Sequence, residues 1–88
     1  SDSQTGNLMD KNLMKSLCIQ TLKQMRLDAQ ITQAQLANML GKPQSFVSKY
    51  ENGDRSLEIS EVYLICKELN KSLCDFEEIL ESFIQEST

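Results

Sequence analysis

The sequence predicts an all-α fold, a single orthogonal bundle of five helices, and three observations support this class. The chain has 88 residues, enough for one domain with one small core. It contains three glycines and one proline, too few turn formers for a sandwich or barrel of many short strands. Apolar residues recur at helical spacing in five segments, which Gly, Pro or capping residues separate.

The first helix is expected over residues 10–29, which contain neither glycine nor proline. Its apolar residues follow a period close to 3.6 residues, and Asp10 is a candidate N-cap. The preceding residues 1–9 are predicted to be a disordered arm or an expression scar. Residues 10–88 would then form the domain.

A second helix is expected from Thr32 to Leu40. Thr32 and Gln35 have the T-x-x-Q spacing of a capping box, and Gly41 supplies the left-handed residue that commonly ends a helix. We expect the inward face to consist of small and apolar side chains, namely Ala34, Leu36, Ala37 and Leu40.

Pro43 fixes the backbone at the entrance to a third helix, predicted over residues 44–52 and ended by Gly53. Because proline has no side-chain acceptor, the usual Ser or Thr capping bond is missing here. Val47 and Tyr50 are the expected buried stripe. The opposite side is polar and contains Gln44, Ser45, Ser48, Lys49 and Asn52.

Two further helices are expected in the C-terminal part of the chain. The fourth covers about residues 58–69, and its predicted inward residues are Ile59, Val62, Ile65, Cys66 and Leu69. The fifth covers about residues 72–86 and begins with an S-x-x-D cap made by Ser72 and Asp75. Its apolar stripe consists of Leu73, Phe76, Leu80, Phe83 and Ile84.

The composition argues against several kinds of chemistry. There is no histidine, which removes the commonest general base and metal ligand. Cys18, Cys66 and Cys74 lack the paired spacing of a zinc ribbon or disulfide framework. We expect these cysteines to be reduced and mostly buried, in a cytoplasmic protein with no membrane span. We also expect no enzymatic activity, no metal and no cofactor.

The charge is divided unevenly along the chain. Residues 1–56 contain seven Lys and Arg against five Asp and Glu, a net charge of +2, whereas residues 57–88 contain two against eight, a net charge of −6. This asymmetry is expected if the first part faces an anion and the second faces away from it. A solvated acidic helix face gives the same asymmetry, so charge alone does not decide between the two interpretations.

The segment ITQAQLANMLGKPQSFVSKYENGDR, residues 31–55, resembles the Cro/phage-repressor type (xenobiotic-response-element type) of helix-turn-helix transcriptional regulators. The following SLEISEVYLICKEL, residues 56–69, is similar to the fourth helix of that family, and the resemblance covers about residues 15–76. It implies a lambda-repressor-like DNA-binding fold, in which the second and third helices form the motif. The third helix would then enter the DNA major groove, which is wide enough for one helix.

The resemblance implies a role for each matching residue. Gln33 would bind a phosphate and help to orient Gln44. Gln44 would contact a base edge, since its amide can donate to and accept from adenine. Base contacts are predicted for Gln44, Ser45, Ser48 and Lys49. Contacts with the DNA backbone are predicted for Gln33, Lys42, Phe46, Asn52 and Arg55.

Two further positions bear on the predicted DNA-binding surface. Phe46 has two open placements, exposed against a thymine methyl group or the DNA backbone, or folded over the second helix. Arg26 and Glu51 align with a family pair that joins the first helix to the end of the third. A bidentate contact between guanidinium and carboxylate would fix the recognition helix against its support.

The fifth helix has more apolar surface than so small a core needs. Leu73 and Phe76 are expected to complete the bundle. Beyond them we predict a homodimer interface, surrounded by glutamates and formed by Ile79, Leu80, Phe83 and Ile84. The alternative is that this helix folds back within one chain and covers apolar residues of the first helix, Leu13, Met14 and Leu17.

The resulting hypothesis is a homodimeric repressor that binds a palindromic double-stranded operator. The alternative is an antitoxin-like or other protein-interaction module that keeps the fold and binds a protein partner through its acidic C-terminal half. The third helix favours the first hypothesis, because its polar side carries no Asp or Glu at positions 44, 45, 48 and 49.

Overall fold

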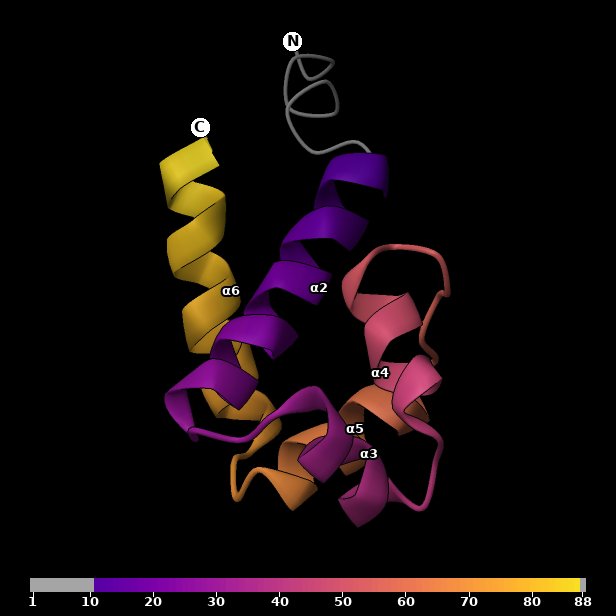
Figure 1. Cartoon of the computed structure of the whole chain (residues 1–88). Coiled ribbons are helices and arrows are strands. Elements are labelled where there is room, and N and C mark those ends of the chain that lie inside the picture. The colour runs from indigo at the N-terminus through magenta and orange to yellow at the C-terminus, as the bar shows by residue number, and fades with distance from the viewer. Residues whose placement is uncertain (1–10, 88) are drawn as a thin grey trace, which may run out of the picture.

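The computed structural model describes residues 11–87, which form five helices and no strand (Figure 1). The expected all-α, five-helix fold is therefore confirmed. The predicted arm, residues 1–9, and the predicted N-cap Asp10 lie outside the described residues. The helices are α2 (Lys11–Asp28), α3 (Gln33–Leu40), α4 (Gln44–Glu51), α5 (Ile59–Glu68) and α6 (Leu73–Ser87).

Local hydrogen bonds begin and end the helices largely where the sequence predicts. The Gln35 amide donates to Thr32 Oγ1 at 3.0 Å, and the Thr32 amide donates to Gln35 Oε1 at 2.8 Å, so the capping box of α3 is confirmed. At the start of α6, the Asp75 amide donates to the Ser72 hydroxyl and the Ser72 amide donates to the Asp75 carboxylate. Four backbone donors at the two helix starts are thus satisfied without tertiary contacts.

One core joins all the helices described between residues 11 and 87. Its fully buried members come from α2, α3, α4, α5 and the residue after α5, and they are Leu22, Met25, Leu36, Ala37, Val47, Tyr50, Ile65, Cys66 and Leu69. Phe76 and Ile79 of α6 pack against this cluster. The packing of α3 on α4 and of α2 on α4 gives the two short helices a common support.

Two residues expected in the core, one each on α3 and α5, are exposed. Ala34 is exposed because the half-buried Gln33, one turn before Leu36 and Ala37, takes the inward position in the first turn of α3. Ile59 is 72% exposed. It is the first residue of α5, one turn before Val62, which is itself only half-buried, so burial decreases toward this end of the helix.

Helix α6 packs along α2 within the chain, which is the arrangement expected as the alternative to dimerisation (Figure 1). Leu17 is buried in this packing, whereas α6 itself contains no fully buried residue. Two expectations for α6 are wrong: Leu73 is 38% exposed at the first residue of the helix, and Ile79 packs on the core instead of extending beyond it. The other predicted interface residues, Leu80, Phe83 and Ile84, are half-buried.

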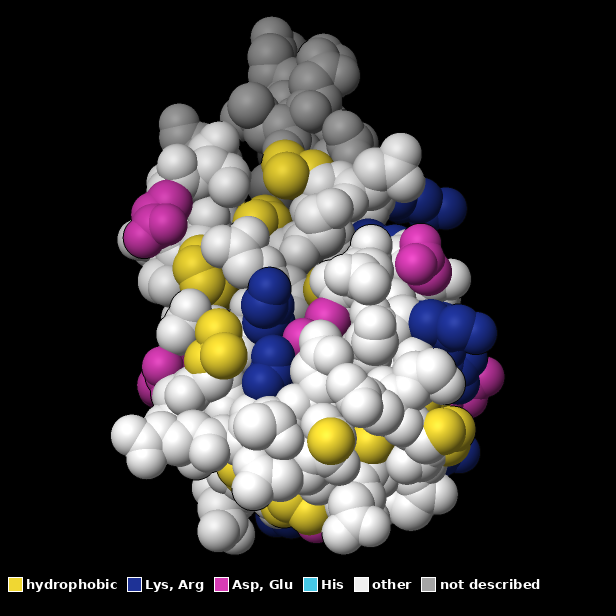
Figure 2. Space-filling model, in the orientation of Figure 1, with side chains coloured by type: hydrophobic (Ala, Val, Ile, Leu, Met, Phe, Trp, Pro, Cys, Tyr) yellow, Lys and Arg dark blue, Asp and Glu magenta, His cyan; other side chains and the backbone are white. Residues whose placement is uncertain are grey.

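Hydrophobic side chains reach the surface along the line where α6 and α2 meet (Figure 2). The two helices diverge toward the start of α2 and the end of α6 (Figure 1). The last turns of α6 therefore leave part of their apolar stripe uncovered. None of the helices between residues 11 and 87 combines the length and the apolar character that crossing a membrane requires.

Candidate nucleic-acid interface

A short, hydrogen-bonded turn connects α3 to α4. Gly41 ends α3 in the left-handed region, at φ +70°, which a residue with a side chain adopts less readily. The Lys42 amide donates to Ala37 O at 2.9 Å, and the Phe46 amide donates to Pro43 O at 2.9 Å. As expected, Pro43 supplies no side-chain cap to α4. The turn fixes the direction in which α4 leaves α3.

The inner side of α4 determines which side chains face outward. Val47 and Tyr50 are completely buried, and Phe46 is half-buried against the core. On the opposite side the exposed residues are Gln44, Ser45, Lys49 and Asn52. Ser48, on the same side, is half-buried. All four residues predicted to contact bases therefore lie on α4, and three of them are exposed.

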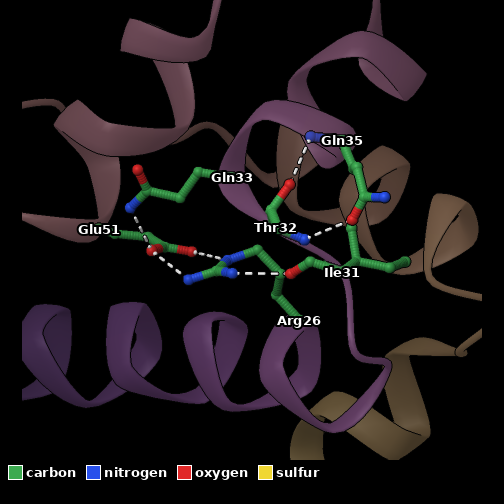
Figure 3. Close-up of polar contacts among 6 residues, drawn as sticks. All are labelled: Arg26, Ile31, Thr32, Gln33, Gln35 and Glu51. Atoms are coloured by element: carbon green, nitrogen blue, oxygen red, sulfur yellow. Dashed lines mark hydrogen bonds and ion pairs between the residues drawn. The ribbon is translucent and has the colours of Figure 1, made fainter.

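Arg26 and Glu51 join α2 to the end of α4 in a bidentate ion pair, as predicted (Figure 3). Arg26 Nε donates to Glu51 Oε2 at 2.8 Å, and Nη2 donates to Oε1 at 3.0 Å. The side chains are 7% and 2% exposed. Arg26 Nη1 also donates to Ile31 O at 2.7 Å, which holds the segment leading into α3. The hydrogen bond from Arg26 to Glu51 raises the Arg26 pKa above its ordinary value, against the opposing effect of burial.

Gln33 belongs to the same network. Its Nε2 donates to Glu51 Oε1 at 2.9 Å, so α3 is joined to the pair as well (Figure 3). In this structure the Gln33 amide bonds to Glu51, at the end of α4 opposite to Gln44. The orientation of Gln44 by Gln33 concerns the DNA-bound protein and stays a prediction.

The half-buried Phe46 ring lies close to two cations. Its ring meets Tyr50 edge-on at a centroid distance of 5.6 Å, with Lys42 Nζ at 5.5 Å and Arg55 Cζ at 4.8 Å from the Phe46 ring centre. The ring is half-buried against the core rather than fully exposed, and these contacts are with α4, the turn and Arg55 rather than with α3. Arg55 also pairs with Glu61, with Nη2 at 2.7 Å from Oε2. This stack was not predicted from the sequence, because Lys42 and Arg55 both lie outside α4, where helical spacing does not place them near Phe46.

Electrostatics favour an anion at the outward side of α4. Its one carboxylate, Glu51, is turned inward and neutralised by Arg26, so the exposed side of the helix carries Lys49 and no acid. Acidic side chains lie instead along α6, which contains no Lys or Arg (Figure 2). Burial raises the pKa of Tyr50 well above its ordinary value, so this central phenol stays neutral.

The cysteines contribute no site at this surface. Cys66 is buried and Cys18 half-buried, and burial raises the pKa of both thiols. Cys74 is exposed, contrary to the expectation of mostly buried cysteines, because it is the second residue of α6 and faces away from the core. Among residues 11–87, no three His, Cys, Asp or Glu side chains gather in a way that could hold a metal ion.

The chain matches a family model described as helix-turn-helix over residues 22–76, which is more than half of its length and includes α3, the turn and α4. A search among curated proteins finds no match. The matched segment contains the Arg26–Glu51 pair, the capping box, the Gly41 turn and the polar side of α4. The chain therefore belongs to the Cro/C1-type helix-turn-helix family of DNA-binding regulators.

Proposed function

We propose that this protein binds a specific double-stranded DNA sequence as a homodimeric repressor, with α4 in the major groove. One observation carries the proposal: the outward side of α4 is polar and free of acids, while Val47, Tyr50 and the Arg26–Glu51 pair fix its inner side. A helix held in this way needs no ordering of its backbone when DNA binds, so only its exposed side chains lose conformational freedom. The major groove, about 12 Å wide, admits one such helix.

The proposed base contacts begin at the first turn of α4. Gln44 is exposed at the first position of the helix and offers an amide that matches adenine N6 and N7. Lys49, five residues further along the helix, carries a donor suited to guanine O6 or N7. Ser45 lies beside Gln44, and the half-buried Ser48 has the least freedom to approach a base.

Contacts with the DNA backbone are proposed on both sides of α4. Lys42 and Arg55 are separated in sequence, but both lie over the Phe46 ring, which sets two cations on one platform. Phosphates are the natural partners of such cations, and these contacts depend on salt rather than on sequence. Phe46 adds an apolar edge there, and Gln33 and Asn52 complete the proposed backbone contacts.

Dimerisation is proposed through the uncovered part of the α6 stripe. Leu80, Phe83 and Ile84 are only half-buried after α6 has packed on α2. A two-fold axis through this stripe would pair it with itself and direct the acidic α6 away from DNA. Two α4 helices set about 34–36 Å apart would then meet successive major grooves of a palindrome. Ile79, which packs on the core, would contribute only its exposed part.

A second candidate is a protein-interaction module. It is favoured by the acidic α6 and by Ile59, Tyr63 and Leu64 of α5, which are 72%, 46% and 55% exposed. Such a module would not need an acid-free α4, so this candidate explains less of the molecule. Both functions can also coexist, since α4 and α6 are separate elements.

A binding selection on randomised duplex DNA tests the proposal. We expect enrichment of one palindrome whose half-sites lie about 10 base pairs apart. The test needs no assumption about the operator. Failure to enrich any sequence, with the protein folded and the salt concentration low, would contradict sequence-specific binding and favour the protein-interaction module.

A further inference from the structure

An apolar groove of about 440 Å³ lies between α2, the segment that leads into α5, and α6. Its floor includes Leu22, which is 1% exposed, and its sides include Leu57, Val62 and Phe76. None of its lining residues belongs to α4. Its volume is in the range of small-molecule sites, about 300–1,000 Å³, although the groove is open to solvent on one side.

Two cations, Lys15 and Arg55, line this groove together with apolar and small side chains, and no carboxylate lines it. Lys15 is exposed and has no ion-pair partner among the described residues. Arg55 Nη2 donates a hydrogen bond to the Glu61 carboxylate. Arg55 Nε is buried and has no hydrogen-bond acceptor among residues 11–87. A buried donor without an acceptor costs free energy.

We infer that this groove binds a small amphipathic anion, with an aromatic or alkyl body on the apolar floor and a carboxylate or sulfonate group toward Arg55 and Lys15. Charge complementarity selects this ligand class over a neutral apolar molecule, because two cations and no carboxylate line the groove. The limited volume selects a small molecule over a helix of a partner chain. The groove shares Arg55 with the DNA-backbone contacts proposed above, but none of its lining residues belongs to α4, so ligand binding is tested without DNA.

The binding test uses 8-anilinonaphthalene-1-sulfonate, an aromatic sulfonate whose fluorescence increases in apolar surroundings. We expect saturable binding to the folded wild type and displacement by decanoate, a carboxylate with an alkyl body. Lys15→Gln should raise the dissociation constant about threefold to fivefold, as for the loss of an exposed ion pair. Lys23→Gln is the matched control, because Lys23 is also exposed on α2 but does not line the groove. Absence of saturable binding, or equal affinity in the two variants, would overturn the inference.

The reactivity of Cys18 shows whether the probe binds in the groove, because this half-buried cysteine lines it. Cys74, which is exposed on α6 and does not line the groove, is the internal control. Alkylation by iodoacetamide is followed separately at the two cysteines by mass spectrometry. The probe should slow the reaction of Cys18 at least threefold and leave Cys74 unchanged. A bound probe that does not protect Cys18 would place the site elsewhere. Protection of Cys18 that increases with protein concentration alone would show that a second copy covers the groove, and this result would also overturn the inference.

Discussion

The helix-turn-helix segment, residues 31–55, and helix α6 are held in the molecule by different means. In the first, Leu36, Val47 and Tyr50 are completely buried, and a polar network of low exposure fixes the helix ends. Helix α6 contains no fully buried residue, although it is the second longest helix of the described chain. Burial and polar contacts are therefore concentrated where α4 must keep its direction. The half-buried apolar residues of α6 are the ones that the proposed dimer would use.

The largest effect is expected on the stability of the fold, when the Arg26–Glu51 ion pair is broken. Arg26→Met leaves the Glu51 carboxylate, 2% exposed, without its cation, and should cost about 3 kcal/mol or more of unfolding free energy. Urea or thermal unfolding measures this loss of unfolding free energy. Lys23→Met, at an exposed position of the same helix, is the control. A second variant, Arg26→Met with Glu51→Leu, should recover part of the loss because no charge is left buried. An unchanged melting midpoint in Arg26→Met would mean that the pair behaves as an ordinary exposed one.

The next prediction concerns α6. Phe83→Glu with Ile84→Glu should weaken dimerisation at least about tenfold, since each apolar side chain contributes about 1.5–3 kcal/mol when fully buried. Sedimentation of the wild type and the variant measures this change. Glu81→Gln, an exposed substitution on the same helix, is the control and should leave the dimer intact. A wild type that stays monomeric at high micromolar concentration, both alone and on DNA, would refute the dimer.

A smaller effect is expected for the cations over Phe46. Lys42→Gln and Arg55→Gln should weaken binding to all DNA sequences by similar factors and reduce the salt dependence, by about 0.9 in the logarithmic slope for each lost phosphate contact. Lys67→Gln is the matched control, because Lys67 Nζ lies at 5.7 Å over the Tyr63 ring on α5, outside the helix-turn-helix. A variant that changes the preferred sequence but not the salt slope would assign the cation to base contact instead.

The smallest effect is expected at the start of α6. Hydrogen bonds from the Ser72 amide and hydroxyl lower the pKa of Asp75 below its ordinary value. A carboxylate with a lowered pKa in the folded state stabilises the fold above the pKa of the unfolded chain, and this contribution is lost as the pH falls through the folded pKa. The wild type should therefore lose slightly more stability than Asp75→Asn between neutral pH and pH values below about 4. Equal pH dependence of the two unfolding curves would show that this cap does not contribute.

Local signals in the sequence predicted most of the fold. Thr32, Gln35 and Gly41 determine the ends of α3 through contacts with near neighbours in the chain, which depend little on tertiary structure. The period of Val47 and Tyr50 predicted the inner side of α4, and therefore the exposure of Gln44 and Lys49.

Contacts between distant residues were harder to predict. The bond from Gln33 to Glu51 and the stacking of Arg55 on Phe46 depend on how three helices meet, which periodicity does not specify. Ile59 and Leu73 lie at the first residues of their helices, where an apolar residue is easily assigned to a core that does not extend that far. The Arg26–Glu51 pair was predicted because the family resemblance aligned it, although the two residues are far apart in sequence.

The most direct test of DNA recognition by α4 is the affinity of Gln44→Ala for the selected duplex and for its single-base-pair variants. Gln44 is exposed and its side chain is not part of the core, so the variant should fold with an unchanged melting midpoint. Asn12→Ala, which removes an exposed amide from α2, is the control. We predict that Gln44→Ala costs about 1–3 kcal/mol on the best site and relaxes the preference at one base pair of each half-site. Unchanged affinity and unchanged preference would contradict base contact by α4.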